Sequence, residues 1–504
     1  MLETDHDRNK VMKWPSRKGI RAIFIVMGLI VILGCVYLFR SSQVIFLIRQ
    51  GRVLFRNKIK YFQIDQNIEK IRTIVQKSAL VGDIGQGKLN LIMVVIDTCR
   101  SDALGCCGGS KNTTPNIDRL AQSSLVFPLV IAHIPVTLPS HCTIFTSLYP
   151  PSHGIRENGT FVLSDSVSTL AEILKEDGYS TGAVVGSFVL DNRFGLNQGF
   201  DYYDDSFHKA PPYPLDEEEP VPEHWQGHDV DTFERTADEI TLQGLRWLEQ
   251  NKKRPFFLWL HYYDPHIPYY PPPDFRGSGA RENYLGEVSF VDECLGYLFD
   301  YLRRSGLEET TIMVITSDHG EGLDEHGYKN HGSHLYDQEL IIPLLVRDPA
   351  GQFPPRNYPF QVDSVDIMPT ILEMLRIPRP AGLQGKNLLP FIRGVKDYEE
   401  SCSYAETLMP FLRWDKAELY SVRTPDWKMI CSLLPGKAPE YLLFNLSADP
   451  EELNNLASRR ADIITILDEK LTEFRSLDSE QRFQHMFSPD KKSREKLKSL
   501  GYMQ

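Results

Sequence analysis

The sequence is poor in cysteine, and its eight cysteines follow neither the spacing of a zinc site nor a regular disulfide framework. Their positions predict buried or free thiols. Acidic residues outnumber basic ones outside the N-terminus. Residues 1–80 hold 15 Lys and Arg against 5 Asp and Glu, whereas the whole chain carries −12, so residues 81–504 carry −22. Such an acidic body repels a polyanion, so nucleic acid is excluded as a partner.

Long hydrophobic runs are also scarce, with one exception. Ala22 to Phe39 is an uncharged stretch of 18 residues between Arg21 and Arg40, which is just long enough to span a bilayer. A cleaved signal peptide is the alternative, but its apolar region is usually about 7–15 residues long and ends in small residues. The run therefore predicts an uncleaved membrane anchor. Basic residues flank it on both sides, so the positive-inside rule does not orient it.

The main body alternates strand-like and helix-like segments. Continuous apolar runs such as Leu89–Ile96, Phe256–His261 and Thr311–Thr316 are typical of strands buried on both faces. Helical patterns near 231–251 and 283–304 lie between them. We therefore expect an α/β fold with a large, doubly wound, mixed or parallel sheet sandwiched by helices, followed by a small C-terminal α+β subdomain.

These segments predict a domain order. The expected parts are a cytoplasmic tail (1–21), a transmembrane anchor (22–39), a juxtamembrane helical stem (40–87), a catalytic domain (88–400), a small C-terminal subdomain (401–457) and a C-terminal helical tail (458–504).

Polar residues suited to ester cleavage follow the predicted strands. Such chemistry requires a cation, an oxygen nucleophile and an acid for the leaving group. Asp97, Thr137 and the pair Asp318-His319 offer carboxylate, hydroxyl and imidazole ligands for a divalent metal. Each alone would be read as a helix cap or a turn, but their joint occurrence at strand ends predicts a site, since ligands bind beyond the carboxyl ends of strands.

Several motifs lie in the order found in a known family. Val136–His141, with the sequence Val-Thr-Leu-Pro-Ser-His, resembles the nucleophile motif of the sulfatase family in the alkaline phosphatase superfamily. Ile96–Asp102 resembles its first metal motif, and Tyr441–Leu456 resembles the end of its C-terminal domain. The match covers about residues 88–457. The chain is identified as a member of this family, with Thr137 at the position of the formylglycine nucleophile.

The resemblance implies roles for individual residues. The implied ligands of one divalent metal ion are Asp97, Thr137, Asp318 and His319. The implied catalytic residues are Thr137 as nucleophile, with His266 and His331 for leaving-group protonation and anion contact. Candidates for further substrate contact are His141, His261 and His334. Calcium suits oxygen-rich sites, whereas an imidazole with a threonine hydroxyl favours zinc or manganese.

Three departures from the family pattern affect the predicted reaction. Thr98 stands where sulfatases usually have a second Asp, His141 replaces an Arg, and Ser187 replaces a Lys. Threonine carries a methyl group on Cβ and cannot become formylglycine, so an ordinary hydroxyl would have to attack.

Three hypotheses follow from these residues. The first is a membrane-anchored, metal-dependent hydrolase of a sulfate or phosphate ester that uses Thr137. The alternatives are a phosphoethanolamine-type transferase or phosphodiesterase, and a non-catalytic binding protein that keeps the fold. The expected partners are an anionic ester, on a glycan or a lipid head group, and the membrane. Anchored relatives in this family imply a single-pass membrane protein with an extracytoplasmic catalytic domain.

Overall fold

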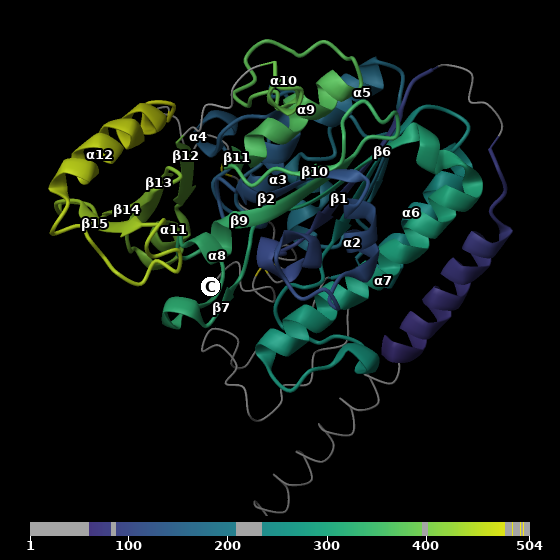
Figure 1. Ribbon diagram of the computed structural model, residues 1–504, viewed down its shortest axis with the longest axis horizontal. Coiled ribbons are helices and arrows are strands. Elements are labelled where there is room, and N and C mark those ends of the chain that lie inside the picture. The colour runs from purple at the N-terminus through teal and green to yellow at the C-terminus, as the bar shows by residue number, and fades with distance from the viewer. Residues whose placement is uncertain are drawn as a thin grey trace, which may run out of the picture. The chain divides into compact units, whose positions relative to one another are not determined.

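The computed structural model describes residues 60–81, 87–207, 234–395 and 402–478, together with residues 486, 494 and 497. The chain divides into an N-terminal unit, Met1–Ile59, and a main unit, Lys60–Gln504. The N-terminal unit lies outside the described residues, so the architecture is that of the main unit (Figure 1).

The predicted membrane location requires correction. Among the helices of the described ranges, none is both long enough and apolar enough to cross a membrane. The predicted tail and anchor, residues 1–39, lie outside those ranges. The prediction of a single-pass protein with an extracytoplasmic catalytic domain is wrong for the described structure, because it contains no spanning helix to support it.

A nine-stranded mixed sheet forms the centre of the main unit. Its order is β10-β2-β9-β6-β1-β5-β3-β4, and β11 pairs with β2. β1 pairs in parallel with β5 and β6, and β3 in parallel with β4 and β5, whereas β9 is antiparallel to β6 and β2. The strands are β1 (Asn90–Ile96), β2 (Ser124–Ile131), β3 (Ser180–Val184), β4 (Tyr202–Asp204), β5 (Phe256–Tyr262), β6 (Thr311–Ser317), β9 (Ile341–Arg347), β10 (Arg356–Asn357) and β11 (Val362–Asp363).

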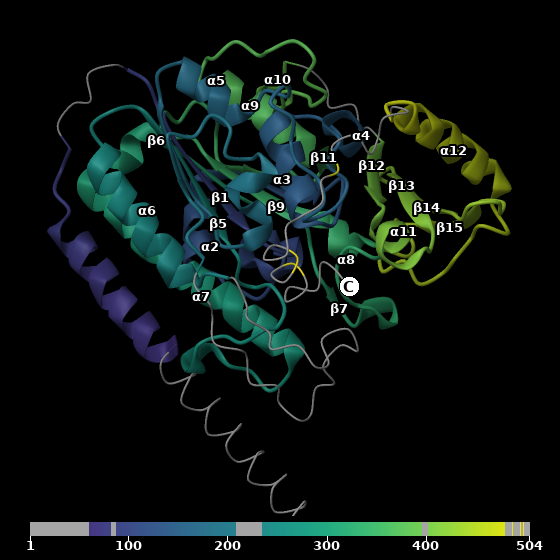
Figure 2. The same cartoon turned by 180° about the vertical axis from the view of Figure 1, so that it is seen from behind.

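Helices cover both faces of this sheet (Figures 1 and 2). Along β1, Leu91 and Met93 pack into one core and Ile92 and Val94 into the other, because successive strand residues point to opposite faces. The first core includes α3, α5 and α9, and the second includes the helix at residues 60–77, α2, α6 and α7. The helices are α2 (Pro115–Ala121), α3 (Thr137–Thr146), α4 (Pro150–His153), α5 (Leu170–Glu176), α6 (Ala237–Asn251), α7 (Ala280–Ser305), α8 (Asp337–Leu340), α9 (Ile367–Met374) and α10 (Leu389–Ile392). The predicted α/β sandwich with a mixed sheet is confirmed.

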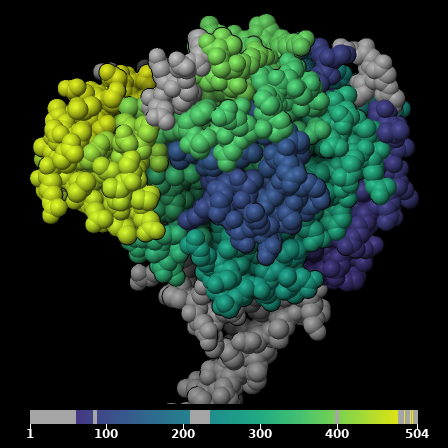
Figure 3. Space-filling view, in the orientation of Figure 1, coloured from purple at the N-terminus to yellow at the C-terminus, as the bar shows by residue number. Residues whose placement is uncertain are grey.

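The helix at residues 60–77 packs on the main unit. Ile64, Ile68, Ile71 and Val75 recur at helical spacing and are buried in the second core. The opposite side of this helix lies at the molecular surface, at the purple edge of Figure 3. This part of the predicted stem therefore buries one face against α6 and α7.

A small subdomain follows the main sheet in sequence. Its four strands form an antiparallel sheet in the order β12-β13-β14-β15. Leu467 and Leu471 of α12 pack in one core with Tyr420 of β13. Figure 1 shows α12 beside the strands of this sheet. The elements are β12 (Ser403–Thr407), α11 (Met409–Trp414), β13 (Glu418–Arg423), β14 (Trp427–Leu433), β15 (Glu440–Asn445) and α12 (Ala461–Arg475).

Candidate metal and catalytic site

The site lies where three neighbouring strands end. Asp97 follows β1, Asp318 and His319 follow β6, and His261 is the penultimate residue of β5. The parallel register aligns Ile96 with the last residues of β5 and β6, so the side chains that follow meet at one edge of the sheet.

The first turn of α3 brings Thr137 to the same edge. Thr137 is the first residue of the helix, and the hydroxyl of Ser140, one turn on, donates to the Asp318 carbonyl oxygen over 2.6 Å. The Leu138 N–H donates to Asn158 Oδ1 over 2.8 Å. The first bond holds the start of α3 against the residues that follow β6, and the second holds it against the segment that follows α4.

Two carboxylates and one imidazole meet there without exposure to solvent. His319 Nε2 lies 3.4 Å from Asp318 Oδ2 and 3.9 Å from Asp97 Oδ1. Burial, together with the neighbouring Asp318, raises the pKa of Asp97 well above its usual range, and burial raises the pKa of Asp318 to about 6. The chain thus places two acids side by side where each disfavours ionisation of the other.

These residues fit a divalent cation. Within the described part of the chain, the buried atoms of this group that lack a hydrogen-bond partner are Asp97 Oδ1 and Oδ2, Thr137 Oγ1, Asp318 Oδ2 and His319 Nε2. His319 Nδ1 lies 2.9 Å from the Gly320 carbonyl oxygen, to which it donates, so Nε2 presents a lone pair. A buried charge is retained when it is paired or bound to a metal.

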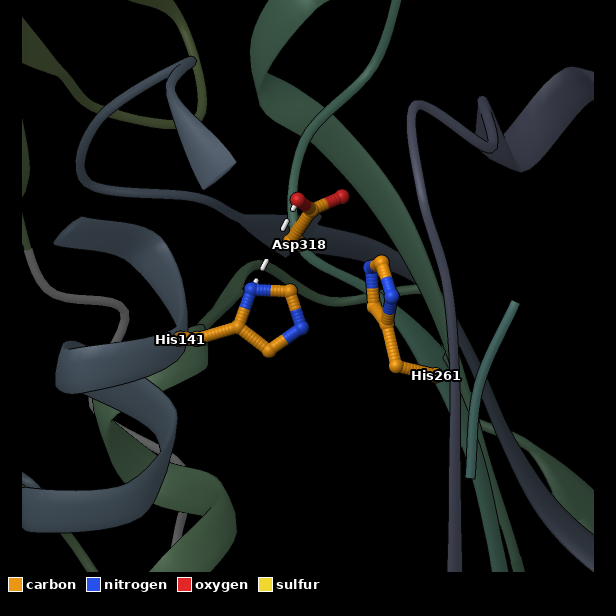
Figure 4. A group of neighbouring side chains, drawn as sticks. All are labelled: His141, His261 and Asp318. Carbon is orange, nitrogen blue, oxygen red and sulfur yellow. Dashed lines mark ion pairs between the residues drawn. The ribbon is translucent and has the colours of Figure 1, made fainter. Parts of the chain in front are cut away.

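A second imidazole pair lies beside the carboxylates. His141 of α3 and His261 of β5 point toward each other and toward Asp318 (Figure 4). Their ring centroids are 4.9 Å apart, and His141 Nδ1 lies 3.7 Å from Asp318 Oδ2. His141 Nδ1 donates to the Thr137 carbonyl oxygen over 2.8 Å. Burial lowers the pKa of both imidazoles.

His266 and His331 form another side of the site. The His331 ring centroid is 4.4 Å from that of His319 and 5.0 Å from that of His266. His331 Nδ1 lies 3.2 Å from Glu321 Oε1, and His266 Nδ1 donates to the Ile267 carbonyl oxygen over 2.7 Å. Burial lowers the pKa of both histidines to about 3.

His334 is directed elsewhere. Its ring stacks on Tyr328 at a centroid distance of 3.5 Å, and its Nδ1 contacts the Ser333 hydroxyl. Tyr328 belongs to the connection between two short strands, β7 (Gly322–Leu323) and β8 (Lys329–Asn330). The structure therefore brings His331, and not His334, to His319.

The sites of departure from the family pattern have distinct surroundings. Thr98 has a left-handed backbone (φ 53°), and its N–H donates to Asp318 Oδ1 over 3.1 Å. Its hydroxyl donates to the Pro265 carbonyl oxygen over 3.3 Å. The Ser187 hydroxyl is fully buried and has no hydrogen-bond partner among the residues described.

Sequence reasoning missed two residues of the site. Glu321 orients the His331 ring, and its place two residues after His319 was the available signal. Asn158 holds the start of α3 through Oδ1, while its Nδ2 is buried and unpaired within the described ranges. No pattern around Asn158 indicated this role, because the contact spans 20 residues.

The chain matches two family models. Residues 89–377 match the sulfatase model, and residues 324–477 match the C-terminal region of N-sulphoglucosamine sulphohydrolase. The chain belongs to the sulfatase family. Members of this family, within the alkaline phosphatase superfamily, are metal-dependent ester hydrolases, which confirms the predicted class of enzyme.

Individual relatives extend this family match. An ulvan-active sulfatase of Formosa agariphila is 25% identical over 432 residues, covering 78% of this chain and 80% of that protein. The multifunctional alkaline phosphatase superfamily protein PehA of Trinickia caryophylli is 26% identical and covers 73% and 91%. The structure of a phosphonate monoester hydrolase of Agrobacterium radiobacter shares the fold, with a TM-score of 0.64, 20% identity and coverage of 80% and 100%.

Proposed function

We propose that this sulfatase-family chain hydrolyses a sulfate or phosphate ester with the Thr137 hydroxyl as nucleophile. The observation that supports it is the set of buried, unpaired atoms contributed by Asp97, Thr137, Asp318 and His319 within the described residues. A divalent metal held by these residues would neutralise the carboxylates and make the hydroxyl of Thr137 more acidic. One imidazole with carboxylate and hydroxyl oxygens favours zinc or manganese over calcium.

The chain's own residues position the nucleophile. The hydrogen bonds of Ser140 and Leu138 fix the first turn of α3, so the side chain at its first residue is fixed as well. An attack by Thr137 Oγ1 would form a bond to sulfur or phosphorus and break the bond to the leaving oxygen. Water would then cleave the covalent ester on Thr137 and regenerate the hydroxyl.

His266 and His331 are placed to serve the leaving group. In the absence of substrate, burial keeps both imidazoles neutral by lowering their pKa to about 3. An anionic ester beside them favours the protonated form and raises those pKa values. The Glu321 carboxylate accepts from His331 Nδ1, which directs the other ring nitrogen of His331 into the site.

A phosphate diester is the second candidate substrate. An unmodified hydroxyl cannot use the route through a hydrated aldehyde, whereas alkoxide attack on phosphorus needs only the groups present. The similarity to a phosphonate monoester hydrolase concerns the fold and does not choose between sulfur and phosphorus. The expected substrate carries its anionic ester on a glycan or a lipid head group.

The test is turnover by the purified full-length chain on aryl sulfate, phosphate monoester and phosphodiester, each with zinc, manganese or calcium. Thr137→Ala is expected to lose at least about 10³-fold in kcat while it still binds metal. Thr146→Ala is the matched control, because Thr146 is a buried threonine of α3 whose hydroxyl bonds to the Cys142 carbonyl oxygen.

The outcomes separate the hypotheses. Thr137-dependent phosphodiester turnover would place the chain with phosphoryl-transfer enzymes, and Thr137-dependent sulfate release would show that a plain hydroxyl suffices. Unchanged turnover in Thr137→Ala would refute the proposed nucleophile. A chain that binds no metal and is silent on every substrate would be a binding protein that keeps the fold.

A further inference from the structure

The orientation of the His261 ring is set by a backbone donor from another strand end. The Gly186 N–H, just beyond β3, lies 3.2 Å from His261 Nδ1 and donates to it. An imidazole nitrogen that accepts a hydrogen bond carries no proton. Nδ1 of His261 therefore carries no proton, and the proton of the ring lies on Nε2.

This protonated nitrogen faces a proposed metal ligand. His261 Nε2 lies 3.4 Å from Asp97 Oδ2, and both side chains are fully buried. Among the described residues neither atom has a formed hydrogen bond, so each is the other's nearby unpartnered polar group. His319 has the opposite tautomer, since its Nδ1 donates to the Gly320 carbonyl oxygen and leaves Nε2 with a lone pair. The two histidines thus present different groups to Asp97: a lone pair from His319 and an N–H from His261.

We propose that His261 is a positioning residue whose Nε2–H faces and orients the otherwise unpartnered Oδ2 of Asp97, and that it is neither a metal ligand nor a substrate contact. The inference rests on the proposed function, because it requires a metal at Asp97, Asp318 and His319. In this proposal Asp97 Oδ2 faces His261, and Asp97 Oδ1, which lies 3.9 Å from His319 Nε2, binds the cation. Residues that orient metal ligands typically contribute ten- to hundredfold to metal affinity.

The same tautomer argues against a second metal between His141, His261 and Asp318, although their ligand atoms lie within 4.8 Å of one another. Coordination through Nε2 would require His261 to lose the proton that the Gly186 bond places there. A metal at this position would therefore have to break the Gly186 bond or bind an imidazolate anion.

Gly186 leaves little room for a side chain. A Cβ there would lie 3.0 Å from both the His261 carbonyl oxygen and the Tyr263 nitrogen. Since these are backbone atoms of β5 and its extension, alanine would push the two segments apart. The N–H of residue 186 would then move away from the His261 ring.

The experiment measures metal content and metal affinity in the full-length chain, by elemental analysis and by competition with a chromophoric chelator for zinc and manganese. His261→Leu removes the donor, and His261→Gln keeps an N–H at nearly the same reach. Leucine is expected to weaken metal binding about ten- to hundredfold, with glutamine close to wild type and Gly186→Ala weakened in the same direction.

His153→Leu is the matched control for fold damage. His153 is also fully buried and hydrogen-bonded, to the Thr143 hydroxyl over 3.1 Å, but it contacts neither carboxylate of the site. It is expected to lower the unfolding temperature without changing metal affinity. Unchanged affinity in His261→Leu, or glutamine as weak as leucine, would overturn the inference while the proposed function stands.

Two further outcomes also decide the question. Two metal ions per wild-type chain, one of them lost in His261→Leu, would overturn the inference by making His261 a ligand. A wild-type chain that binds no metal would overturn both the inference and the proposed function.

Discussion

Two buried carboxylate clusters in this molecule are satisfied in opposite ways. Asp97 and Asp318 lie side by side at the strand ends, and burial raises the pKa of both. Asp337 of α8 is buried as well, yet it contacts Lys428 Nζ at 2.7 Å and Arg423 Nη2 at 3.0 Å. Burial alone would raise the pKa of Asp337, but these two cations lower it.

The difference shows which cluster is complete within the chain. Lys428 belongs to β14 and Arg423 to β13. Their ion pairs with Asp337 therefore connect the C-terminal subdomain to the part of the chain that contains the nine-stranded sheet. At the site, the described chain supplies no such cation to Asp97 or Asp318, and a cation from solution would complete the set. The ion pairs of Asp337 stabilise the fold, whereas the carboxylates of Asp97 and Asp318 are available to bind a cation.

Breaking the complete cluster is expected to have the largest effect. Asp337→Asn leaves the fully buried Lys428 without one of its two carboxylates, and loss of a buried ion-pair partner costs about 3–5 kcal/mol. Urea unfolding monitored by circular dichroism measures this. Asp201→Asn, at a half-exposed pair with Lys175, is the control and is expected to cost less than about 1 kcal/mol. An equal loss of unfolding free energy in Asp337→Asn and Asp201→Asn would contradict the conclusion that the Asp337 cluster stabilises the fold.

Removing the metal is expected to lower the stability of the protein through the Asp97 and Asp318 cluster and to leave the Asp337 ion pairs unchanged. At a metal concentration of about 100 times Kd, bound metal stabilises the folded state by about 2.7 kcal/mol. Chelation should therefore lower the unfolding temperature of the wild type and of Asp337→Asn by a similar amount. Asp318→Asn should show almost no response, and a full response there would place the metal elsewhere.

Neutralising the incomplete cluster should increase stability at the expense of function. Asp318→Asn removes one of two neighbouring buried acids and keeps an oxygen for the N–H groups of Thr98 and His319. Metal-free Asp318→Asn is expected to be about 0.5–2 kcal/mol more stable than metal-free wild type. Its turnover should be lost in the assay used for Thr137→Ala. A less stable variant would show that the two acids do not oppose folding.

Lowering the pH should reduce the loss of stability caused by Asp337→Asn. A carboxyl whose folded pKa lies below its unfolded value of about 3.9 contributes stability above that pH and loses it as the pH falls. The stability difference between wild type and Asp337→Asn should therefore be constant near neutral pH and shrink below about pH 4, by up to about 1.4 kcal/mol per pH unit. Unfolding curves at several pH values test this, and a difference independent of pH would contradict the lowered pKa.

Much of the sheet was predictable because its central strands are apolar on both faces. The expected strands at Phe256–His261 and Thr311–Thr316 correspond to β5 and β6 within one residue, and the helix near 283–304 to α7. β2 and β9 were missed. They pair antiparallel with each other, while β2 also pairs in parallel with β10 and β11. β2 contains Pro128 and a bulge between Phe127 and Val130, so its pattern is not that of a regular strand.

The sequence alone determined the family, the sheet class and the acids and imidazoles offered as site residues, because these depend on local pattern and motif order. Tertiary structure decided which of them meet. It placed His331 beside His319, stacked His334 on Tyr328, and paired Asp337 with cations from another subdomain. It also set the tautomer of His261 through a backbone N–H 75 residues away. Such contacts join segments distant in sequence, and their geometry exists only once the strands are packed.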